Sequence, residues 1–408
     1  MSSRRVIALD AGPGTLQAWV RALGPALDGS GPALAPMPAG PGSQRDRLTA
    51  DLGRGDAVAA GPDGVALVIP TSGSTGAPKG AMLTAAAVLA SQAATHSRLG
   101  GPGRWVLALP LTHVAGLMVV VRAVAAGAPP ADATTEGSFD PAHFVETTGS
   151  QAAAAGAGGL RLYTSLVPTQ LARLLDAPGG PAALARYDAI LVGAAATPAT
   201  LLVRAAAAGV RVVTTYGMSE TCGGCVYDGV PLDGVGADLD ADGTVLIGGP
   251  TLFAGYWGRP DLTAAAFDPG GRLVTCDRGS FDDRGRLRIL GRVDDVIVTG
   301  GEKVAPAQVE DALMLLPAVA GAVVVGVPDP QWGERVVAVV VPSAGSRVVL
   351  DQVRQALVGA LPAPALPRQL LVVTGLPLLA SGKPDRAAAR ALASAPAAKP
   401  RARTGRGA

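Results

Sequence analysis

Short apolar runs and helix-forming stretches follow one another along the chain, and the first clear pair of them flanks a loop. Residues 65–69 are apolar and rich in β-branched side chains, which predicts a buried strand, and the Ala-rich residues 85–94 predict a helix. The loop between them, residues 71–80, consists of Gly, Ser, Thr, Ala, Pro and Lys. Because small residues keep it thin, its backbone N–H groups can approach an anion closely. We therefore predict a phosphate-binding loop, with an unliganded surface loop as the open alternative; its spacing is not that of the P-loop.

A regular alternation from residue 160 onward predicts a mainly parallel sheet. Its predicted strands and helices cover residues 160–164, 167–175, 189–192, 198–208 and 210–214. In such βαβαβ units, ligands bind at the carboxyl ends of the strands. Gly193 and Tyr216 each follow a predicted strand, as the phosphate loop does, so these strand ends indicate one crevice.

Other segments give weaker signals. His113 follows a predicted strand that begins at Trp105 and precedes a predicted helix over residues 117–126. A lone histidine is more often structural, but a place at a strand end keeps a functional role open. His96 and His143 lack such a context and are predicted to be surface residues. We expect loops over residues 29–42, which are rich in Gly and Pro, and an irregular connection over residues 128–158.

The pattern changes twice in the second half of the chain. Short strands separated by Gly and Asp turns predict an antiparallel meander over residues 229–290. Beyond it, strands and helices predict a compact α+β unit. The predicted fold is thus α/β, with a large N-terminal domain of mainly parallel sheets flanked by helices (residues 1–291) and a small mobile C-terminal domain (residues 292–394). The basic residues 395–408 are predicted to be a disordered tail.

Composition narrows the classes of function. A net charge of +2 over 408 residues argues against nucleic-acid and membrane partners. Three cysteines argue against a disulfide scaffold and fit a reducing cytosol. No long apolar segment follows the N-terminus, so the chain is predicted to be cytoplasmic and not inserted in a membrane.

Several segments together resemble the adenylate-forming superfamily of acyl-CoA synthetases, luciferases and peptide-synthetase adenylation domains. They occur in the family's order as TSGSTGAPKG (71–80), YGMSET (216–221), TCD (275–277), GRVDD (291–295), TGGEK (299–303) and SGK (381–383). Within the superfamily the chain is most similar to o-succinylbenzoate–CoA ligases of menaquinone biosynthesis. That narrower resemblance lies in LPLTHVAG (109–116), SLVPTQL (165–171) and GKPDR (382–386).

The resemblance implies an AMP-forming acid–thiol ligase that uses ATP, Mg²⁺ and coenzyme A. It implies that ATP is bound by Thr71, Ser72, Gly73, Ser74, Thr75, Gly76, Lys79, Gly193, Ala194, Ala195, Thr215, Tyr216, Gly217, Met218, Ser219, Asp277 and Arg292. Catalytic roles are implied for Lys383, Glu220, His113 and Thr75, of which Glu220 and Thr75 would bind the metal. Lys383 would bridge the substrate carboxylate and the α-phosphate.

The resemblance also implies where the other substrates bind. The acyl group would contact His113, Ser165, Thr169, Gly217, Gly223 and Gly224. Gly300 and Gly301 would line a tunnel for coenzyme A, and Asp294 would be the hinge of the small domain. A C-x-x-C pair, Cys222 and Cys225, is interpreted as lining the pocket, because the chain offers no second pair of ligands for a metal.

The implied partners are thus a small carboxylic acid, ATP and coenzyme A, and a homodimer is left open. One alternative is an acyl-CoA synthetase for another aryl or medium-chain acid. Another is a ligase that delivers its adenylate to a carrier protein. A non-catalytic nucleotide- or acyl-binding relative is the alternative from a different class, against which the charged site residues argue.

Overall fold

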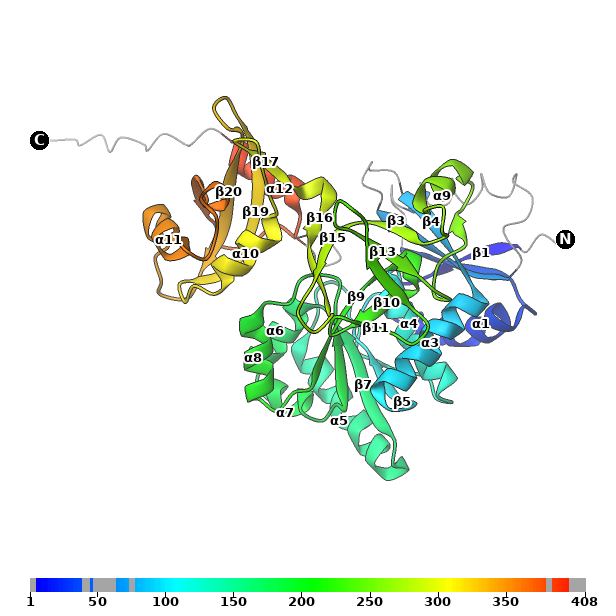
Figure 1. The fold of residues 1–408 in the computed structure, drawn as a ribbon. Helices are drawn as coiled ribbons and strands as arrows, with labels where there is room; N and C mark the ends of the chain where they lie inside the picture. The colour runs from blue at the N-terminus through cyan, green and yellow to red at the C-terminus, as the bar shows by residue number, and fades with distance from the viewer. Residues whose placement is uncertain (1–4, 39–44, 47–63, 73–77, 379–383, 396–408) are drawn as a thin grey trace, which may run out of the picture. The chain divides into compact units, whose positions relative to one another are not determined.

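The computed structural model describes residues 5–38, 45–46, 64–72, 78–378 and 384–395 (Figure 1). The chain divides into two compact units, Met1–Ile289 and Leu290–Ala408, and each is considered by itself here. The functional division predicted after residue 291 stays a prediction. Apart from Ala395, the predicted disordered tail lies outside the described residues.

The first sheet of the large unit carries the predicted phosphate loop. Its strand order is β1-β2-β3-β4-β14, with bounds β1 (Val6–Asp10), β2 (Ala33–Met37), β3 (Val65–Ser72), β4 (Pro78–Thr84) and β14 (Gly255–Tyr256). Strands β1, β2 and β3 are parallel, whereas β3 and β4 form an antiparallel pair in which Thr71 faces Lys79. Helix α1 (Leu16–Asp28) connects β1 to β2.

Two predictions for this sheet were wrong. Residues 29–42 contain the buried strand β2, whose proline and two alanines hid its apolar pattern. The phosphate loop does not lead directly into a helix, because β4 comes first and buries Ala81 and Leu83. The predicted helix follows as α3 (Ala85–Leu99), where the Thr84 hydroxyl caps the first turn by accepting from the Ala87 N–H.

The second sheet of the large unit confirms the predicted parallel core. Its order is β11-β10-β9-β8-β7-β5-β6, and β6, β5, β7, β8 and β9 are parallel. The bounds are β5 (Gly103–Leu107), β6 (Ala131–Asp132), β7 (Arg161–Leu166), β8 (Ala189–Val192), β9 (Val212–Met218), β10 (Gly223–Tyr227) and β11 (Val230–Pro231). The connecting helices are α4 (Val114–Ala125), α5 (Pro141–Gly158), α6 (Pro168–Asp176), α7 (Gly180–Leu184) and α8 (Ala199–Ala207).

Helix α5 corrects the prediction of an irregular connection over residues 128–158. Pro141 occupies its first turn, and the Asp140 side chain accepts from the Ala142 N–H. Only Phe144, Thr148 and Ala155 of this helix are buried. Its apolar face is therefore too sparse to stand out among the surrounding Ala, Gly and Thr.

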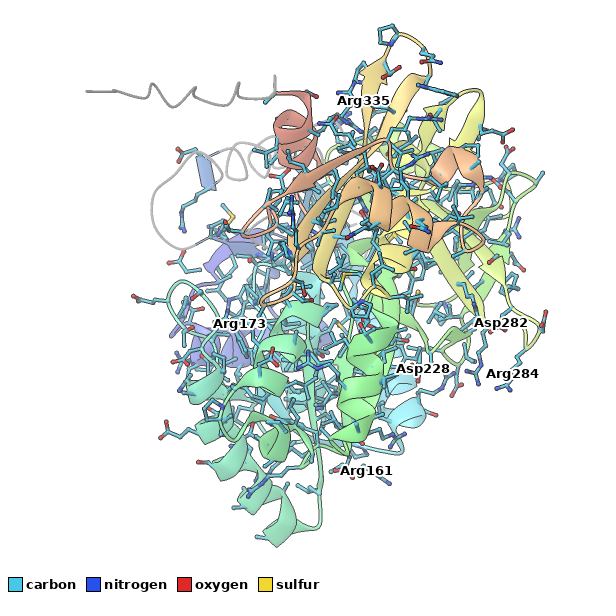
Figure 2. All side chains as sticks on the ribbon, turned by 90° about the vertical axis from the view of Figure 1, so that its left-hand side faces the viewer. Arg161, Arg173, Asp228, Asp282, Arg284 and Arg335 are labelled. Atoms are coloured by element: carbon cyan, nitrogen blue, oxygen red, sulfur yellow. The ribbon has the colours of Figure 1, made fainter. Side chains whose placement is uncertain are left out.

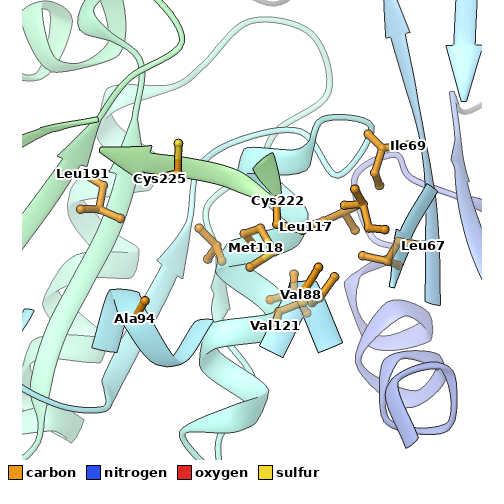
Figure 3. Packing of buried hydrophobic residues seen from close by; sticks show 14 of the residues in the cluster. Leu67, Ile69, Val88, Ala94, Leu117, Met118, Val121, Leu191, Cys222 and Cys225 are labelled. Atoms are coloured by element: carbon orange, nitrogen blue, oxygen red, sulfur yellow. The ribbon is translucent and has the colours of Figure 1, made fainter. Parts of the chain in front are cut away.

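Both faces of the parallel sheet are covered, as its strands require. Trp105 and Leu191 face the cluster that contains α3 and α4, whereas Val106 and Ile190 face the cluster that contains α5, α6 and α8. Figure 3 shows part of the first cluster, in which Met118 and Leu117 lie near Cys222. Because side chains pack on both faces, the strands are held in place and their carboxyl ends lie along one side of the sheet.

The two cysteines of the C-x-x-C pair lie in the core. Cys222 and Cys225 are fully buried, so neither thiol lines an open cavity. Burial raises the pKa of both thiols above the ordinary value, which keeps them protonated and unreactive. Among the described residues, no group of three or more His, Cys, Asp or Glu side chains could hold a metal ion.

The prediction that His96 lies on the surface was wrong. Its side chain is 7% exposed, and Nδ1 lies 2.8 Å from Nε2 of Gln92. Burial, followed by the positive charge of Arg122, lowers the pKa of His96 to about 4. The Ala-rich helix α3 buries a broad face, which accommodates a neutral imidazole beside Trp105. His143 is partly exposed at the start of α5.

A smaller sheet in the order β12-β13-β15-β16 confirms the predicted meander. Its bounds are β12 (Gly236–Leu239), β13 (Thr244–Gly248), β15 (Leu273–Phe281) and β16 (Leu287–Arg292). A 3-10 turn, η1 (Ser219–Thr221), follows β9, and helix α9 (Pro260–Ala266) follows β14. Arg161, Arg173 and Arg284 of this unit are exposed, and Figure 2 labels them.

The C-terminal unit is the expected α+β structure. Its sheet has the order β18-β17-β20-β19, with β21 parallel to β20. Its strands are β17 (Ile297–Thr299), β18 (Glu302–Val304), β19 (Val319–Asp329), β20 (Gly333–Pro342) and β21 (Gln369–Val372). Its helices and turns are η2 (Val293–Asp295), α10 (Pro306–Met314), α11 (Leu350–Leu357), η3 (Ala363–Ala365) and α12 (Arg386–Ser394). No helix in the described part of the chain is long and apolar enough to cross a membrane.

Candidate active site

The ends of β8 and β9 come very close together at Gly193. A Cβ atom on Gly193 would lie 2.3 Å from Oγ1 of Thr215, which leaves space only for glycine. The next residue, Ala194, has a left-handed backbone with φ of 68°. A non-glycine residue in that region costs about 1 kcal/mol. Such local strain is typical of binding sites, and it falls within the segment predicted to lie along adenine.

Tyr216 and Asp277 form the first polar pair of the site. The Tyr216 hydroxyl on β9 donates to Oδ2 of Asp277 on β15 over 2.8 Å. Burial, followed by the negative charge of Asp277, raises the pKa of Tyr216, so its phenol stays neutral. The Asp277 N–H donates to the Thr275 hydroxyl over 3.1 Å, which fixes the backbone at Asp277. Two residues from separate predicted motifs are thereby brought into contact.

Glu220, Tyr256 and Lys79 form a second polar cluster. The Tyr256 hydroxyl donates to Oε1 of Glu220 over 2.8 Å, and Lys79 Nζ lies 5.1 Å from the centre of the Tyr256 ring. Burial and then the Glu220 carboxylate raise the pKa of Tyr256, and the nearby Cys276 adds to this effect. Because Cys276 precedes Asp277 directly, the two polar pairs are neighbours.

Sequence reasoning did not identify Tyr256. It lies on the short strand β14, opposite Ala81 of β4, and this pairing joins distant parts of the chain. One signal was present in the sequence, because Tyr256 and Trp257 are adjacent aromatic residues between glycines in a chain with only 3% aromatic residues.

The glycines predicted to contact the acyl group have a clear structural role. Gly224 pairs with Gly217 across β10 and β9, and a Cβ atom on Gly217 would lie 2.0 Å from the Gly223 carbonyl oxygen. The Thr221 hydroxyl donates to that same oxygen over 2.7 Å and accepts from the Met218 N–H over 2.9 Å. These contacts hold the turn that carries Glu220, and the acyl-binding role stays a prediction.

His113, Ser165 and Thr169 lie near the carboxyl ends of β5 and β7, which are adjacent strands. His113 is exposed and begins α4, where a Cβ atom on Gly116 would lie 2.3 Å from the Pro110 carbonyl oxygen. Ser165 is 6% exposed on β7, whereas Thr169 is exposed on α6. These three of the six predicted acyl-binding residues therefore lie near the carboxyl ends of two neighbouring strands, and their role stays a prediction.

In the C-terminal unit, the predicted hinge and the glycine turn each have defined contacts. Arg292 and Asp294 form an ion pair of 3.3 Å. Gly300 and Gly301 connect β17 to β18 with φ of 60° and 84°, and a Cβ atom on Gly300 would lie 3.1 Å from the Trp332 ring. The Gly300 N–H donates to the Trp332 carbonyl over 2.8 Å. Arg368, which sequence reasoning missed together with Trp332, has its guanidinium 3.5 Å from the centre of that ring.

Some predicted residues cannot be placed. Gly73, Ser74, Thr75 and Gly76 of the phosphate loop lie outside the described residues, as does Lys383. The loop is bounded by described strands, and there the Thr71 hydroxyl donates to the Lys79 carbonyl over 3.2 Å. The half-buried Glu220 carboxylate fits a magnesium ion, which usually takes one or two carboxylates together with substrate phosphates and water.

Two family models match the chain. One is described as AMP-binding enzyme and covers residues 31–257, and the other is described as AMP-binding enzyme C-terminal domain and covers residues 308–383. A probable 2-succinylbenzoate–CoA ligase of Mycobacterium tuberculosis is 47% identical over 365 residues, which cover 89% of this chain and 91% of the relative.

Further relatives extend the comparison. A feruloyl-CoA synthase of an Amycolatopsis species is 32% identical over 348 residues, which cover 79% of this chain and 69% of the relative. The fold is similar to that of the o-succinylbenzoate CoA synthetase of Bacillus subtilis, solved with its acyl-adenylate intermediate. That similarity has a TM-score of 0.72 and 25% identity, and it covers 94% of this chain and 87% of the other.

Proposed function

Because the chain belongs to the AMP-binding, adenylate-forming enzyme family, we propose that it is an acid–thiol ligase that activates o-succinylbenzoate for menaquinone biosynthesis. The enzyme would convert the acid and ATP into an acyl-adenylate and pyrophosphate. Coenzyme A would then displace AMP and form the thioester. The observation that carries this choice of substrate is the 47% identity to a probable 2-succinylbenzoate–CoA ligase over 89% of the chain.

We propose that the nucleoside of ATP binds beside the Tyr216–Asp277 pair. Asp277 would accept hydrogen bonds from the ribose hydroxyls, with Arg292 contributing from the small domain. The Tyr216 ring would stack on adenine, because flat aromatic systems pack favourably against one another. The adenine segment would comprise Gly193, Ala194, Ala195, Thr215, Gly217, Met218 and Ser219. The close approach at Gly193 supports a narrow slot for a flat base.

We propose that the triphosphate is held by Lys79 and by Thr71, Ser72, Gly73, Ser74, Thr75 and Gly76 of the phosphate loop. Glu220 would hold Mg²⁺, with Thr75 as a second ligand, and the bound ion would neutralise phosphate charge. Tyr256 donates to one oxygen of Glu220 and so orients the carboxylate. Lys79 lies over the ring of the same tyrosine, which supports a joint role for the three side chains.

We propose that Lys383 lowers the barrier to adenylation by bridging the carboxylate and the α-phosphate. The small domain, residues 292–394, would then turn about Asp294 relative to the large domain, residues 1–291. After this turn Gly300 and Gly301 would line the path of coenzyme A, while His113 would stand between this path and the acyl pocket. That pocket would include Ser165, Thr169, Gly217, Gly223 and Gly224.

We also propose a cytoplasmic location, which the small number of cysteines supports. A homodimer stays a proposal about assembly, and light scattering on the eluting peak of a sizing column would test it. A mass near 40.4 kDa, the mass of one chain, would contradict it.

The function is tested by ATP–pyrophosphate exchange with a panel of aryl and medium-chain acids. We expect exchange that depends on o-succinylbenzoate and a thioester product only when coenzyme A is added. Exchange with another acid alone, for example ferulate, would favour the second candidate, an acyl-CoA synthetase of different specificity. Exchange without a thioester in the presence of coenzyme A would favour a ligase that serves a carrier protein.

A further inference from the structure

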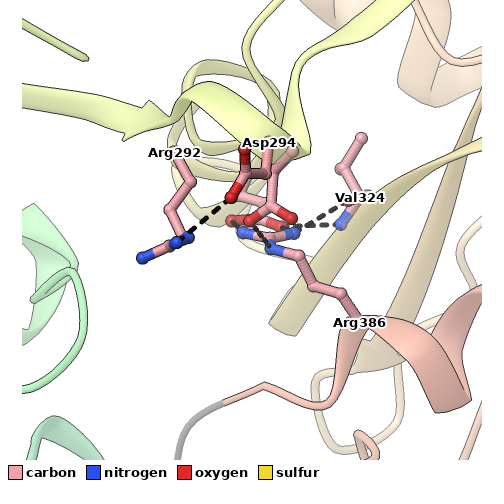
Figure 4. Close-up of polar contacts among 6 residues, drawn as sticks. Arg292, Asp294, Val324 and Arg386 are labelled. Carbon is pink, nitrogen blue, oxygen red and sulfur yellow. Dashed lines mark hydrogen bonds and ion pairs between the residues drawn. The ribbon is translucent and has the colours of Figure 1, made fainter. Parts of the chain in front are cut away.

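Arg386 is the centre of a polar cluster that joins three segments of the C-terminal unit. Its Nη1 and Nη2 atoms donate to the two carboxylate oxygens of Glu310 over 2.5 and 3.0 Å. Nε forms an ion pair with Oδ2 of Asp295 at 3.0 Å. Nη1 also donates to the Val324 carbonyl over 2.8 Å, while the Val324 N–H donates to Glu310 over 2.7 Å. Figure 4 shows Arg386 reaching from the start of α12 toward Val324 and the turn that contains Asp294.

The cluster is largely shielded from solvent. An arginine can bond to all of its acceptors, whereas a lysine could not. The side chains of Arg386, Asp295 and Glu310 are 24%, 25% and 15% exposed. Burial alone would lower the pKa of Arg386, but its contacts with Glu310 and Asp295 outweigh that effect and raise it. All three guanidinium nitrogens are engaged, in a planar arrangement that an ammonium group cannot reproduce.

The position of Arg386 in its helix also calls for an explanation. It is the first residue of α12, where the helix dipole disfavours a positive charge. The local cap is already provided by Asp385, whose side chain accepts from the Ala388 N–H over 2.9 Å. The contribution of Arg386 therefore lies in its long-range contacts rather than in starting the helix.

Backbone contacts hold the residues just before Arg386 against residues 377 and 378. The Asp385 N–H donates to the Pro377 carbonyl over 2.9 Å, and Leu378 and Pro384 form an isolated antiparallel bridge. Lys383 precedes Pro384 directly in the sequence. The bridged residues Leu378 and Pro384 thus flank, in the sequence, the lysine to which adenylation is assigned above, and Arg386 follows that lysine by three residues.

The other end of the cluster is next to the proposed hinge. Asp295, which pairs with Arg386, follows Asp294 in the turn η2, and Asp294 is itself paired with Arg292. Resting on the proposed function, we infer that Arg386 is a positioning residue that links the base of the Lys383 segment to the hinge turn through Asp295. Rotation at Asp294 would then turn α12 together with the hinge turn, Glu310 and β19, and Lys383 precedes α12 by three residues in the sequence.

The test separates the two half-reactions in the full-length enzyme. Adenylation is measured by single-turnover formation of acyl-adenylate, and thioester formation is measured from chemically prepared acyl-adenylate and coenzyme A. For Asp295→Asn and Arg386→Gln, we expect the rate constant of adenylation to fall about 10- to 100-fold, as small misplacements of a catalytic group do. The KM for ATP and the rate of thioester formation should change by less than about threefold, since neither depends on Lys383.

The chain offers a matched control. Arg390 lies on the same helix, and its Nε donates to the Gly326 carbonyl of the same strand β19 over 3.0 Å. Arg390→Gln therefore removes an arginine contact to β19 without touching the hinge, and it should leave both half-reactions near wild type. The double variant Asp295→Asn/Arg386→Gln should be no slower than Arg386→Gln alone, because both substitutions break one link.

Different results would overturn the inference or the function beneath it. If the wild-type enzyme formed no adenylate with any acid, the proposed function would fail. If it were active and Asp295→Asn adenylated at the wild-type rate, the link would be refuted. An equal loss in both half-reactions together with a lower melting temperature would assign Arg386 a purely structural role. Asp295→Asn keeps the Arg386–Glu310 pair, so it remains informative if Arg386→Gln does not fold.

Discussion

The large and small units each contain a polar cluster near a segment of the proposed active site, and the two differ in how charge is compensated. In the large unit, the carboxylates of Glu220 and Asp277 each accept a hydrogen bond from a neutral tyrosine. In the small unit, Glu310 and Asp295 share the guanidinium of Arg386. Both clusters are partly buried, so solvent exposure does not account for the difference.

We interpret the first cluster as one whose carboxylates bind a ligand, and the second cluster as one that stabilises the fold. The neutral phenol of Tyr256 donates to Glu220 without cancelling the negative charge of that carboxylate, which is the kind of ligand a metal ion takes. A carboxylate paired with a guanidinium at both oxygens is already neutralised, and removing one partner leaves the other charge buried. Substitutions in the first cluster should therefore lower activity with little loss of folding stability, whereas substitutions that unpair a charge in the second cluster should lower folding stability as well.

The largest expected effect concerns Lys383, which is proposed to bridge the substrate carboxylate and the α-phosphate. Lys383→Ala should slow adenylation by about 10²- to 10³-fold, because it removes the charge that faces the α-phosphate in the transition state. Binding of ATP, measured by isothermal titration, should change little. The control Lys399→Ala, in the basic tail, should behave as wild type. Loss of ATP affinity equal to the loss of rate would contradict a role specific to the transition state.

The same substitution in each cluster sharpens the comparison. Glu220→Gln should slow pyrophosphate exchange by about 10²-fold with a change in unfolding free energy below about 0.5 kcal/mol. Glu310→Gln should instead lower the unfolding free energy by about 2–3 kcal/mol, because the half-buried Arg386 loses its main partner. Urea unfolding monitored by circular dichroism gives the second value. Similar stability losses in the two variants would break the distinction.

Removing a tyrosine hydroxyl tests whether the tyrosines orient the carboxylates. Tyr256→Phe and Tyr216→Phe should each lower kcat/KM for ATP by about 10-fold, the effect expected from one hydrogen bond to a charged group. Retained stability would be checked by thermal unfolding. A variant with the wild-type kcat/KM would show that the corresponding carboxylate needs no orientation by its tyrosine.

The smallest effect comes from a group in the core that belongs to neither cluster. The pKa of His96 is lowered to about 4 in the folded protein, below its ordinary value of 6.5. The unfolded chain therefore binds the proton first, so stability is full above pH 6.5 and is lost as the pH falls toward 4. Between pH 7.5 and pH 6 this amounts to about 0.8 kcal/mol.

His96→Gln should remove this pH dependence, because glutamine does not titrate, and His143→Gln is the matched control for a partly exposed histidine. The measurement is the unfolding free energy in urea across that range of pH. A slope that persisted in His96→Gln would assign the effect to another group.

The parts of the fold that were predictable from sequence have sharp local boundaries. Strand β8 has the predicted bounds, since Asp188 and Gly193, which are typical turn residues, delimit its apolar run. Strands β2 and β4 were missed because prolines and glycine interrupt their apolar pattern, and they are stabilised by neighbouring strands. Helix α5 was missed because few of its residues are buried.

In the candidate site, too, some residues were predictable from the sequence and others were not. The motifs that contain Tyr216 and Asp277 were recognised in the sequence, and the structure brings these two side chains into contact, while the single crevice at the strand ends stays a prediction. Tyr256 and Arg386 could not be assigned their contacts, because each bonds to a residue far away in the sequence. His96 was misjudged since an Ala-rich helix does not reveal how wide a face it buries.

The central claim is tested most directly by identifying the products by mass spectrometry. With o-succinylbenzoate, ATP and Mg²⁺, the account predicts an enzyme-bound o-succinylbenzoyl-adenylate, which coenzyme A then converts into one thioester and one AMP. Formation of ADP and phosphate instead of AMP and pyrophosphate would contradict the proposed chemistry, and absence of any acyl-adenylate would contradict it as well.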